Sequence, residues 1–288
     1  MLLQWEHVKQ LLKLIVAAEF EYYAEGNEMV IFSARGERRR EKFNFTSIAS
    51  LRYALDNNIA LENVDTEKFF KAKFFDGSYQ FCVRKGNPSD LATLKDVCTG
   101  NEYAFLYPYL PGKSVVDVGA NIGDTAVLFA KRGAALIEAY EIHPVLHDVA
   151  RRNIELNGVN DKVRLYDFGI GSTADEMRMR DDSSLGPTAG FGLKEAQHGR
   201  DVVVKLVSMK SVIERLREID ILKMDCAGAE FDIFQSLSHD DLRSIGVIGV
   251  EYHRDPQPLI SRLEQSGFDV KMISSHSSSL GLLLAVRV

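Results

Sequence analysis

Cysteine is scarce in this chain of 288 residues, which contains only Cys82, Cys98 and Cys226. None of the three belongs to a paired motif of the kind that builds a disulfide framework or a metal site. Proteins held together by disulfides fold in oxidising compartments, so scattered single cysteines favour a reducing one. We therefore expect a cytoplasmic protein.

Positive charge is also in short supply. The chain has 35 Lys and Arg against 41 Asp and Glu, a formal net charge of −6. Binding to nucleic acid depends on clustered positive charge, so this balance predicts that nucleic acid is not a partner. The basic run Arg35–Lys42 does not change this expectation, because Glu37 and Glu41 interrupt it and such runs usually form solvated loops.

Uninterrupted hydrophobic runs are missing from the N-terminal region. Met1–Ala18 is largely apolar, but it is broken by Glu6, His7, Lys9 and Lys13. This pattern predicts neither a membrane span nor a signal peptide. Apolar residues recur at helical spacing over residues 2–24 and predict an amphipathic helix, whose apolar face packs within the protein or, alternatively, forms a homodimer contact.

The sequence does contain a strand–turn–helix unit at residues 114–130. A short β-rich run, Ser114–Val118, carries Asp117, and a glycine-containing turn and an apolar segment with helical spacing follow. Such a unit opens a doubly wound α/β sheet, which binds nucleotides at the carboxyl ends of its strands. A second strand, Ala135–Glu141, ends in an acid that can accept hydrogen bonds from the ribose hydroxyls of an adenosine.

The turn indicates which cofactor is bound. A dinucleotide requires glycine at the first, third and sixth positions, so that its pyrophosphate can approach the backbone. These positions hold Gly119, Asn121 and Asp124, and the carboxylate of Asp124 would repel a pyrophosphate. S-adenosylmethionine has an ammonium, a carboxylate and a sulfonium instead, so Asp117 could hold the ammonium while N–H groups of the turn bind the carboxylate. The turn predicts S-adenosylmethionine in preference to NAD.

A third strand, Lys162–Tyr166, is followed by an acid and an aromatic residue that could meet the adenine ring, although the acid could equally be a solvated loop residue. The residues assigned to cofactor binding are Asp117, Gly119, Asn121, Gly123, Asp124, Thr125, Glu141, Asp167 and Phe168. Further strands are expected at 174–180 and 201–207. The segment Asp181–Arg200 between them is long and rich in Gly and Ser, which predicts a mobile lid.

Four stretches together resemble the FkbM-type S-adenosylmethionine-dependent methyltransferases. They are Val116–Gly123 (VDVGANIG), Glu141, Leu222–Glu230 (LKMDCAGAE) and Glu251-Tyr252-His253. The resemblance implies an α/β fold of class I, a Rossmann-like sheet of seven strands whose last strand is antiparallel. It also implies methylation of a hydroxyl on an acceptor such as a sugar, a glycolipid or a small metabolite.

The resemblance covers residues 80–288 and includes the Glu102-Tyr103 pair ahead of the core. Residues 1–79 are expected to form a separate helical and hairpin region for substrate selection or a dimer contact. A hairpin of Phe69–Phe75 with Tyr79–Val83 is expected near the boundary, which lies between residues 66 and 90.

Ala227 is the main departure from the family pattern. Relatives usually have Asp-Val-Glu-Gly-Ala-Glu where this chain has Asp-Cys-Ala-Gly-Ala-Glu, so Ala227 stands where a glutamate is expected. Because a fold does not fix a function, a non-catalytic S-adenosylmethionine-binding protein on the same fold is the alternative to an O-methyltransferase.

Methylation of a hydroxyl requires a group that removes its proton. Asp225 and Glu251 follow two strands, Ile219–Met224 and Ile245–Val250, that the family places side by side. These two acids are the first candidates for the group that accepts the proton. His253 is assigned a supporting role, and Glu230 is the next candidate. Two carboxylates and an imidazole could instead bind a divalent cation. The sequence provides no third fixed carboxylate, so we assign no metal site.

Overall fold

A computed structural model describes residues 20–25, 28–33, 38–42, 50, 53–54, 57, 59–63, 69–85, 87–100, 102–181 and 200–288. The chain divides into two compact units, Met1–Ala92 and Thr93–Val288.

Antiparallel strands make up most of the described part of the first unit. Its elements are β1 (Phe20–Glu25), β2 (Glu28–Ser33), β3 (Arg38–Lys42), β4 (Ala60–Asn63), β5 (Phe69–Phe74), the 3-10 turn η1 (Phe75–Gly77), β6 (Tyr79–Arg84) and the start of α3 (Pro88–Cys98). The strands form two sheets, β1-β2-β3 and β4-β5-β6. The pairing of β5 with β6 confirms the predicted hairpin.

Two predictions for this unit are wrong where the structure describes the residues. Residues 20–24 belong to β1 rather than to a helix, and the rest of the predicted helix 2–24 lies outside the described residues. Tyr22 and Tyr23 favour the extended backbone, in which they pair with β2. The basic run, expected as a loop, pairs with β2 as strand β3 over Arg38–Lys42.

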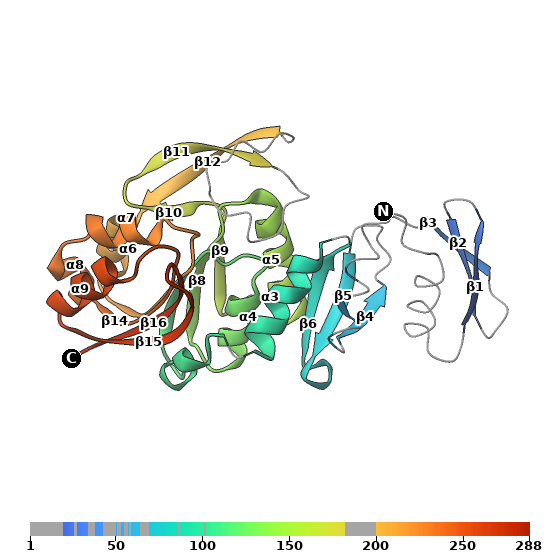
Figure 1. Cartoon of the computed structure of the whole chain (residues 1–288), viewed down its shortest axis with the longest axis horizontal. Helices are drawn as coiled ribbons and strands as arrows, with labels where there is room; N and C mark the ends of the chain where they lie inside the picture. The colour runs from blue at the N-terminus through green and yellow to red at the C-terminus, as the bar shows by residue number, and fades with distance from the viewer. Residues whose placement is uncertain are drawn as a thin grey trace. The chain divides into compact units, whose positions relative to one another are not determined.

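A seven-stranded sheet lies at the centre of the second unit (Figure 1). Its strands are β7 (Ser114–Val118), β8 (Leu136–Tyr140), β9 (Val163–Tyr166), β13 (Ile219–Met224), β14 (Ile245–Tyr252), β15 (Phe268–Ser277) and β16 (Leu280–Arg287). They lie in the order β15-β16-β14-β13-β7-β8-β9, and β16 alone runs opposite to the other six strands. The predicted seven-stranded α/β sheet with an antiparallel last strand is confirmed.

Helices cover both faces of this sheet (Figure 1). They are α4 (Asp124–Lys131), α5 (Pro144–Leu156), α6 (Met209–Leu216), α7 (Glu230–Ser236), α8 (His239–Arg243) and α9 (Gln257–Gln265), with the 3-10 helix η2 (Ala104–Tyr109) before β7. Apolar residues of α6, α7 and α9 form one core with Val116 and Val118. Because strand side chains alternate between faces, Asp117 points to the opposite side, where α4 and α5 pack against β8 and β9.

A smaller sheet follows β9 in the chain. It consists of β10 (Gly169–Gly171), β11 (Asp175–Asp181) and β12 (Arg200–Ser208), in the order β10-β12-β11. The strands predicted at 174–180 and 201–207 are thus present. Residues 182–199, most of the predicted lid, lie outside the described residues.

The strand order reverses between β7 and β13. The chain leaves β7 toward β8, whereas β13 is followed by β14 on its other side. Open α/β sheets bind ligands in the crevice at such a reversal. Here the two loops approach closely, since a Cβ atom on Gly119 would lie 1.9 Å from the carbonyl oxygen of Asp225. Only glycine permits this approach.

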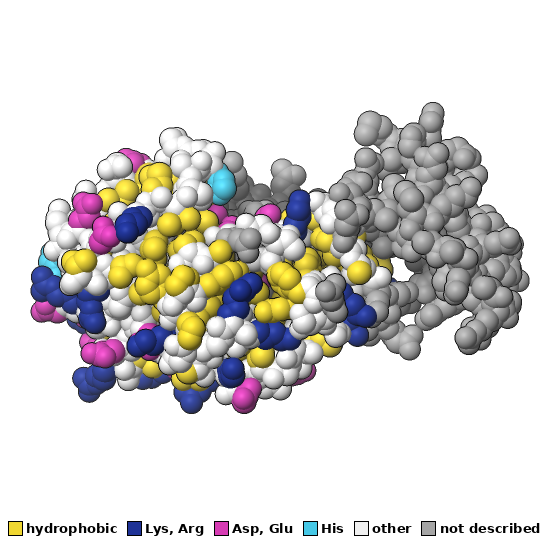
Figure 2. All heavy atoms as spheres, turned by 90° about the horizontal axis from the view of Figure 1, so that it is seen from below, with side chains coloured by type: hydrophobic (Ala, Val, Ile, Leu, Met, Phe, Trp, Pro, Cys, Tyr) yellow, Lys and Arg dark blue, Asp and Glu magenta, His cyan; other side chains and the backbone are white. Residues whose placement is uncertain are grey.

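No helix in the described part of the chain is both long and apolar enough to cross a membrane. Figure 2 shows one face of the molecule, on which the Lys and Arg side chains lie in separate small groups among hydrophobic and uncharged ones. That face presents no continuous basic stripe over the described residues.

The close approach at Gly119 predicts a large stability difference between two glycine variants. Gly119 and Gly112 both have a left-handed backbone, with φ of +77° and +73°, but a Cβ on Gly112 would meet nothing within 4 Å. Gly112→Ala should lower the free energy of unfolding by about 1–2 kcal/mol, the cost of the backbone conformation alone. Gly119→Ala adds overpacking, so it should lose about 1–3 kcal/mol more, measured by urea denaturation. Equal losses would contradict the packing argument.

Candidate active site

The turn after β7 contains three residues with a left-handed backbone. Gly119, Asn121 and Gly123 have φ of +77°, +51° and +80°, a region that glycine enters without strain and asparagine tolerates. The N–H of Gly119 donates to the carbonyl of Tyr140 at 3.0 Å, which ties the turn to the end of β8. Helix α4 begins directly after the turn, so its first N–H groups face the crevice.

A buried ion pair lies beneath this turn. The Lys223 ammonium is 3.1 Å from Asp117 Oδ1, and the two side chains are 2% and 0% exposed. Thr125 Oγ1 donates to Asp117 Oδ2 at 2.7 Å, and Lys223 also donates to the Gly119 carbonyl at 2.8 Å. Burial alone would lower the pKa of Lys223, but Asp117 and the neighbouring Asp225 and Asp124 raise it overall, so the lysine is charged.

This pair changes the role expected for Asp117. From sequence, the carboxylate was assigned to the ammonium of the cofactor, whereas in the structure both of its oxygens are engaged inside the protein. Lys223 was not among the predicted site residues. The sequence feature that could have identified it is a lone lysine within the apolar strand Ile219–Met224. In the structure this lysine pairs in register with Asp117.

Glu141 links the loops that follow β7 and β8. Its two carboxylate oxygens accept from the backbone N–H groups of Asn121 and His143, each at 2.7 Å. The side chain is buried, and burial raises the pKa of Glu141 to about 7 despite these two hydrogen bonds. The predicted acid after the second strand is therefore in the crevice with its orientation fixed.

Asp167 and Phe168 line a cavity of about 830 Å³. Ile142 and His147 line the same cavity, and Val203–Val207 of β12 form another side of it. The wall is mainly apolar, with an acid at the end of β9, so it suits a flat aromatic ring that carries polar edges. The two residues assigned to adenine thus face one space, and β12 was not predicted to contribute to it.

Asp124, in the first turn of α4, is buried with its Oδ1 atom lacking a hydrogen-bond partner among the described residues. Burial is the main reason that the pKa of Asp124 is raised to about 7. Among the predicted cofactor residues, Asn121 likewise has a buried Oδ1 atom without a hydrogen-bond partner in the described part of the chain.

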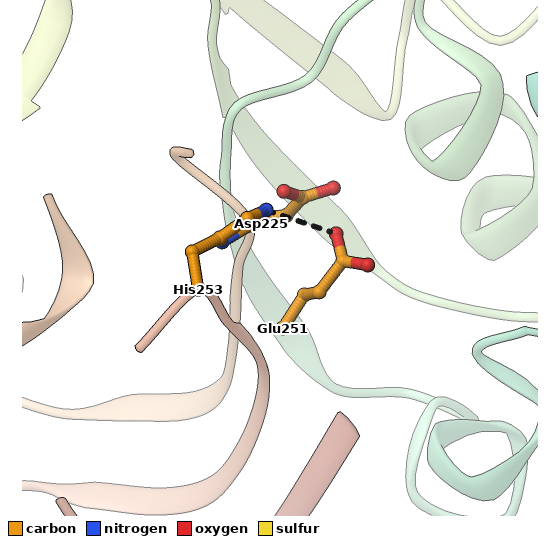
Figure 3. A group of neighbouring side chains, drawn as sticks. All are labelled: Asp225, Glu251 and His253. Carbon is orange, nitrogen blue, oxygen red and sulfur yellow. Dashed lines mark ion pairs between the residues drawn. The ribbon is translucent and has the colours of Figure 1, made fainter. Parts of the chain in front are cut away.

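Asp225, Glu251 and His253 converge at the ends of β13 and β14 (Figure 3). One carboxylate oxygen of each acid and one ring nitrogen of the histidine all lie within 4.8 Å of one another. Burial and then the charge of Asp225 raise the pKa of Glu251 to about 9. Three of the four residues assigned to catalysis from sequence are therefore brought together.

Glu102 and Tyr103 flank this group. The Tyr103 hydroxyl donates to Asp225 Oδ2 at 3.2 Å, and the Lys223 ammonium lies 5.4 Å from the Tyr103 ring centre. Burial and then the charge of Asp225 raise the pKa of Glu102 to about 7. The Glu102-Tyr103 pair, seen in the sequence only as part of a resemblance, thus contacts and influences the site.

Glu230, the fourth residue assigned to catalysis, is fully buried behind the histidine. Its Oε1 accepts from the backbone N–H of His253 at 2.9 Å and lies 3.0 Å from His253 Nδ1, while Oε2 accepts from the Gly228 N–H at 2.8 Å. Burial would lower the pKa of His253, but Glu230 raises it overall. Glu230 therefore orients the imidazole.

Ala227 lies in the turn between β13 and α7. It has a φ of +52°, and Gly228 follows with +108°. A non-glycine residue in this region is uncommon, and alanine there is strained by about 1–2 kcal/mol. The backbone of this turn exposes the Gly228 N–H to Glu230, so the strained conformation serves the contact that holds the histidine.

The strand order and the position of the acidic groups at the strand ends define the class of protein. A glycine turn after the first strand, an acid after the second, and carboxylates at the ends of the fourth and fifth are arranged as in a Rossmann-like class I methyltransferase. The chain belongs to the family of FkbM methyltransferase domains, whose match covers residues 117–270, more than half of its length. The family resemblance seen in the sequence is confirmed.

Several known proteins are similar to this chain. Methyltransferase sdnD of Sordaria araneosa is 29% identical over 191 residues, which cover 54% of this chain and 73% of that protein. The ribosomal protein L11 methyltransferase of Carboxydothermus hydrogenoformans is 42% identical over 69 residues, 23% of either chain. The crystal structure of methyltransferase FkbM from Methylobacillus flagellatus KT gives a TM-score of 0.42 at 11% identity, and covers 60% of this chain and 43% of that one.

The buried ion pair predicts how this crevice responds to loss of Lys223. Lys223→Met leaves the Asp117 carboxylate buried without its cation, which should lower the free energy of unfolding by about 3–5 kcal/mol. Adding Asp117→Asn removes the unpaired buried charge, so the double variant should recover at least about half of the lost free energy of unfolding. Urea denaturation of both variants measures the difference, and a single variant as stable as the parent would contradict it.

Proposed function

We propose that this methyltransferase moves a methyl group from S-adenosylmethionine to a hydroxyl group of a sugar, a glycolipid or a small metabolite. The observation that carries the proposal is the position of Asp225 and Glu251 at the ends of adjacent strands, beside the glycine turn after β7. A hydroxyl is a poor nucleophile until it loses its proton, and these carboxylates are placed where an acceptor would meet the methyl group.

The proposed cofactor lies across the carboxyl ends of β7, β8 and β9. Its adenine enters the cavity lined by Asp167 and Phe168, and its ribose hydroxyls donate to Glu141. Its methionine part follows the turn Gly119–Gly123 toward Asp225. Asp117 supports this arrangement through Lys223, because it is itself buried away from the crevice.

Methyl transfer from a sulfonium is an in-line displacement, so the protein has two tasks. It aligns the acceptor oxygen with the methyl carbon, and it receives the hydroxyl proton as the oxygen attacks. The new C–O bond forms as the C–S bond breaks, and the electron pair of that bond stays on sulfur to give S-adenosylhomocysteine. We assign the proton to Asp225, which the Tyr103 hydroxyl holds in place.

Glu141 provides the test of cofactor binding. Calorimetry should show S-adenosylhomocysteine binding in the micromolar range, and Glu141→Ala should weaken it by about 1.5–3 kcal/mol, because hydrogen bonds to a charged group are lost. Tighter binding of NAD than of S-adenosylhomocysteine would overturn the proposal.

The pH dependence of the same binding is its control. The charged form of Glu141 is the better acceptor for ribose hydroxyls, and its pKa in the free protein is about 7. Affinity should therefore fall as the pH is lowered through 7. Glu141→Gln cannot titrate, so it should bind weakly at every pH. Any slope that remains would come from the other acids of the site whose pKa is about 7, Asp124 and Glu102.

Asp225 provides the test of catalysis. Asp225→Asn should cut methyl transfer from labelled S-adenosylmethionine by about a hundredfold or more, while affinity for S-adenosylhomocysteine stays nearly unchanged. Asp269→Asn, which alters an exposed acid on β15, is the matched control and should keep full turnover. Normal turnover by Asp225→Asn would assign the proton to another residue. A parent protein that binds the cofactor but methylates no hydroxylated acceptor in a broad panel would favour a non-catalytic binding protein.

A further inference from the structure

The group formed by Asp225, Glu251 and His253 offers ligand atoms from three side chains. Backbone pairing of β13 with β14 fixes the strand ends that carry them. Figure 3 shows the Glu251 carboxylate and the His253 ring turned toward each other, with the Asp225 carboxylate beside them. The side chains of Glu251 and His253 are 15% and 27% exposed, so a hydrated ion can reach the group.

The separation between His253 and Glu251 suits an ion better than a direct contact. His253 Nε2 lies 3.8 Å from Glu251 Oε2, which is too long for a hydrogen bond. Oxygen and nitrogen ligands lie about 2.0–2.3 Å from a small divalent cation, so two ligands of one ion are about 3–4.5 Å apart. The 3.8 Å gap and the 4.8 Å limit for the whole group are close to these spacings.

Glu230 supplies a second and independent observation. It is fully buried, lies outside the group, and is 3.0 Å from His253 Nδ1 while also accepting from two backbone N–H groups. A carboxylate so engaged acts as an acceptor, which places the Nδ1 proton toward it and leaves the lone pair on Nε2. Histidines that bind metals almost always donate their other ring N–H to a carboxylate or carbonyl in this way.

We propose that Asp225, Glu251 and His253 bind a divalent cation, in place of the metal-free site expected from the sequence. Two carboxylate oxygens and one imidazole nitrogen suit a first-row transition metal such as Mn²⁺ better than Mg²⁺, which prefers oxygen ligands and retains its water. Three protein ligands leave positions for water and for an acceptor oxygen.

The catalytic role of this ion rests on the proposed function. The acceptor hydroxyl oxygen coordinates the ion, which lowers the pKa of the hydroxyl. Its proton passes to the oxygen of Asp225 that does not bind the ion, and the resulting alkoxide takes the methyl carbon as the C–S bond breaks. The ion changes neither its charge nor its oxidation state.

The experiment is a titration of Mn²⁺ alone into protein that has been treated with EDTA and dialysed, followed by calorimetry and by the loss of the free Mn²⁺ resonance signal. The parent should bind one Mn²⁺ per chain. His253→Ala should weaken binding at least tenfold, and Glu230→Gln, which removes the orienting carboxylate, by about tenfold to a hundredfold. His276→Ala, at an exposed histidine on β15, is the matched control and should bind as the parent does. Thermal unfolding checks that each variant is folded.

The outcomes separate this inference from the proposed function. Absence of saturable Mn²⁺ binding to the parent, or binding by a folded His253→Ala protein that equals the parent's, would overturn the metal site. If S-adenosylhomocysteine still binds and Asp225→Asn still lacks turnover, the proposed function stands without the ion. If Mn²⁺ binds as expected but S-adenosylhomocysteine does not bind, the metal site stands and the proposed function fails.

Discussion

The ion pair of Lys223 with Asp117 is the interaction on which the rest of the crevice depends. It joins the two strands at the point where the strand order reverses, and the same ammonium donates to the Gly119 carbonyl. A buried charge is stable only when it is paired and fully hydrogen-bonded. The contacts of Lys223 tie the loop after β7 to β13, in an arrangement that places Gly119 close to the backbone of Asp225.

The acids of this crevice have two different roles. Asp117, Glu141 and Glu230 accept from groups within the protein, and each holds two segments together. Asp225 also accepts from the Tyr103 hydroxyl, but it and Glu251 lie near each other at strand ends that are only partly buried. Keeping two carboxylates this close is electrostatically unfavourable, so the fold maintains an arrangement that a cationic ligand would relieve.

Much of the fold could be predicted because its signals are local. The apolar β-rich runs predicted the strands of the main sheet. The polar residues at the ends of these runs identified Asp225, Glu251 and His253 as candidates, and the structure brings them together. The N-terminal prediction failed at residues 20–24, because apolar residues in a short aromatic segment fit both helical and extended periods. Pairing with β2 decided between them.

The sequence by itself determined the glycine turn and the acids at the strand ends, since each depends on neighbours within a few residues. It also indicated the family, through four separate stretches between residues 116 and 253. Tertiary structure alone decided which acids are exposed. Asp117 meets Lys223 only because β7 and β13, more than 100 residues apart in the chain, pair in that register. Glu230 meets His253 because helix α7 packs against β14. Packing in the folded chain, through strand register and burial, determines which partner each acid meets, and the spacing of residues along the sequence does not reveal it.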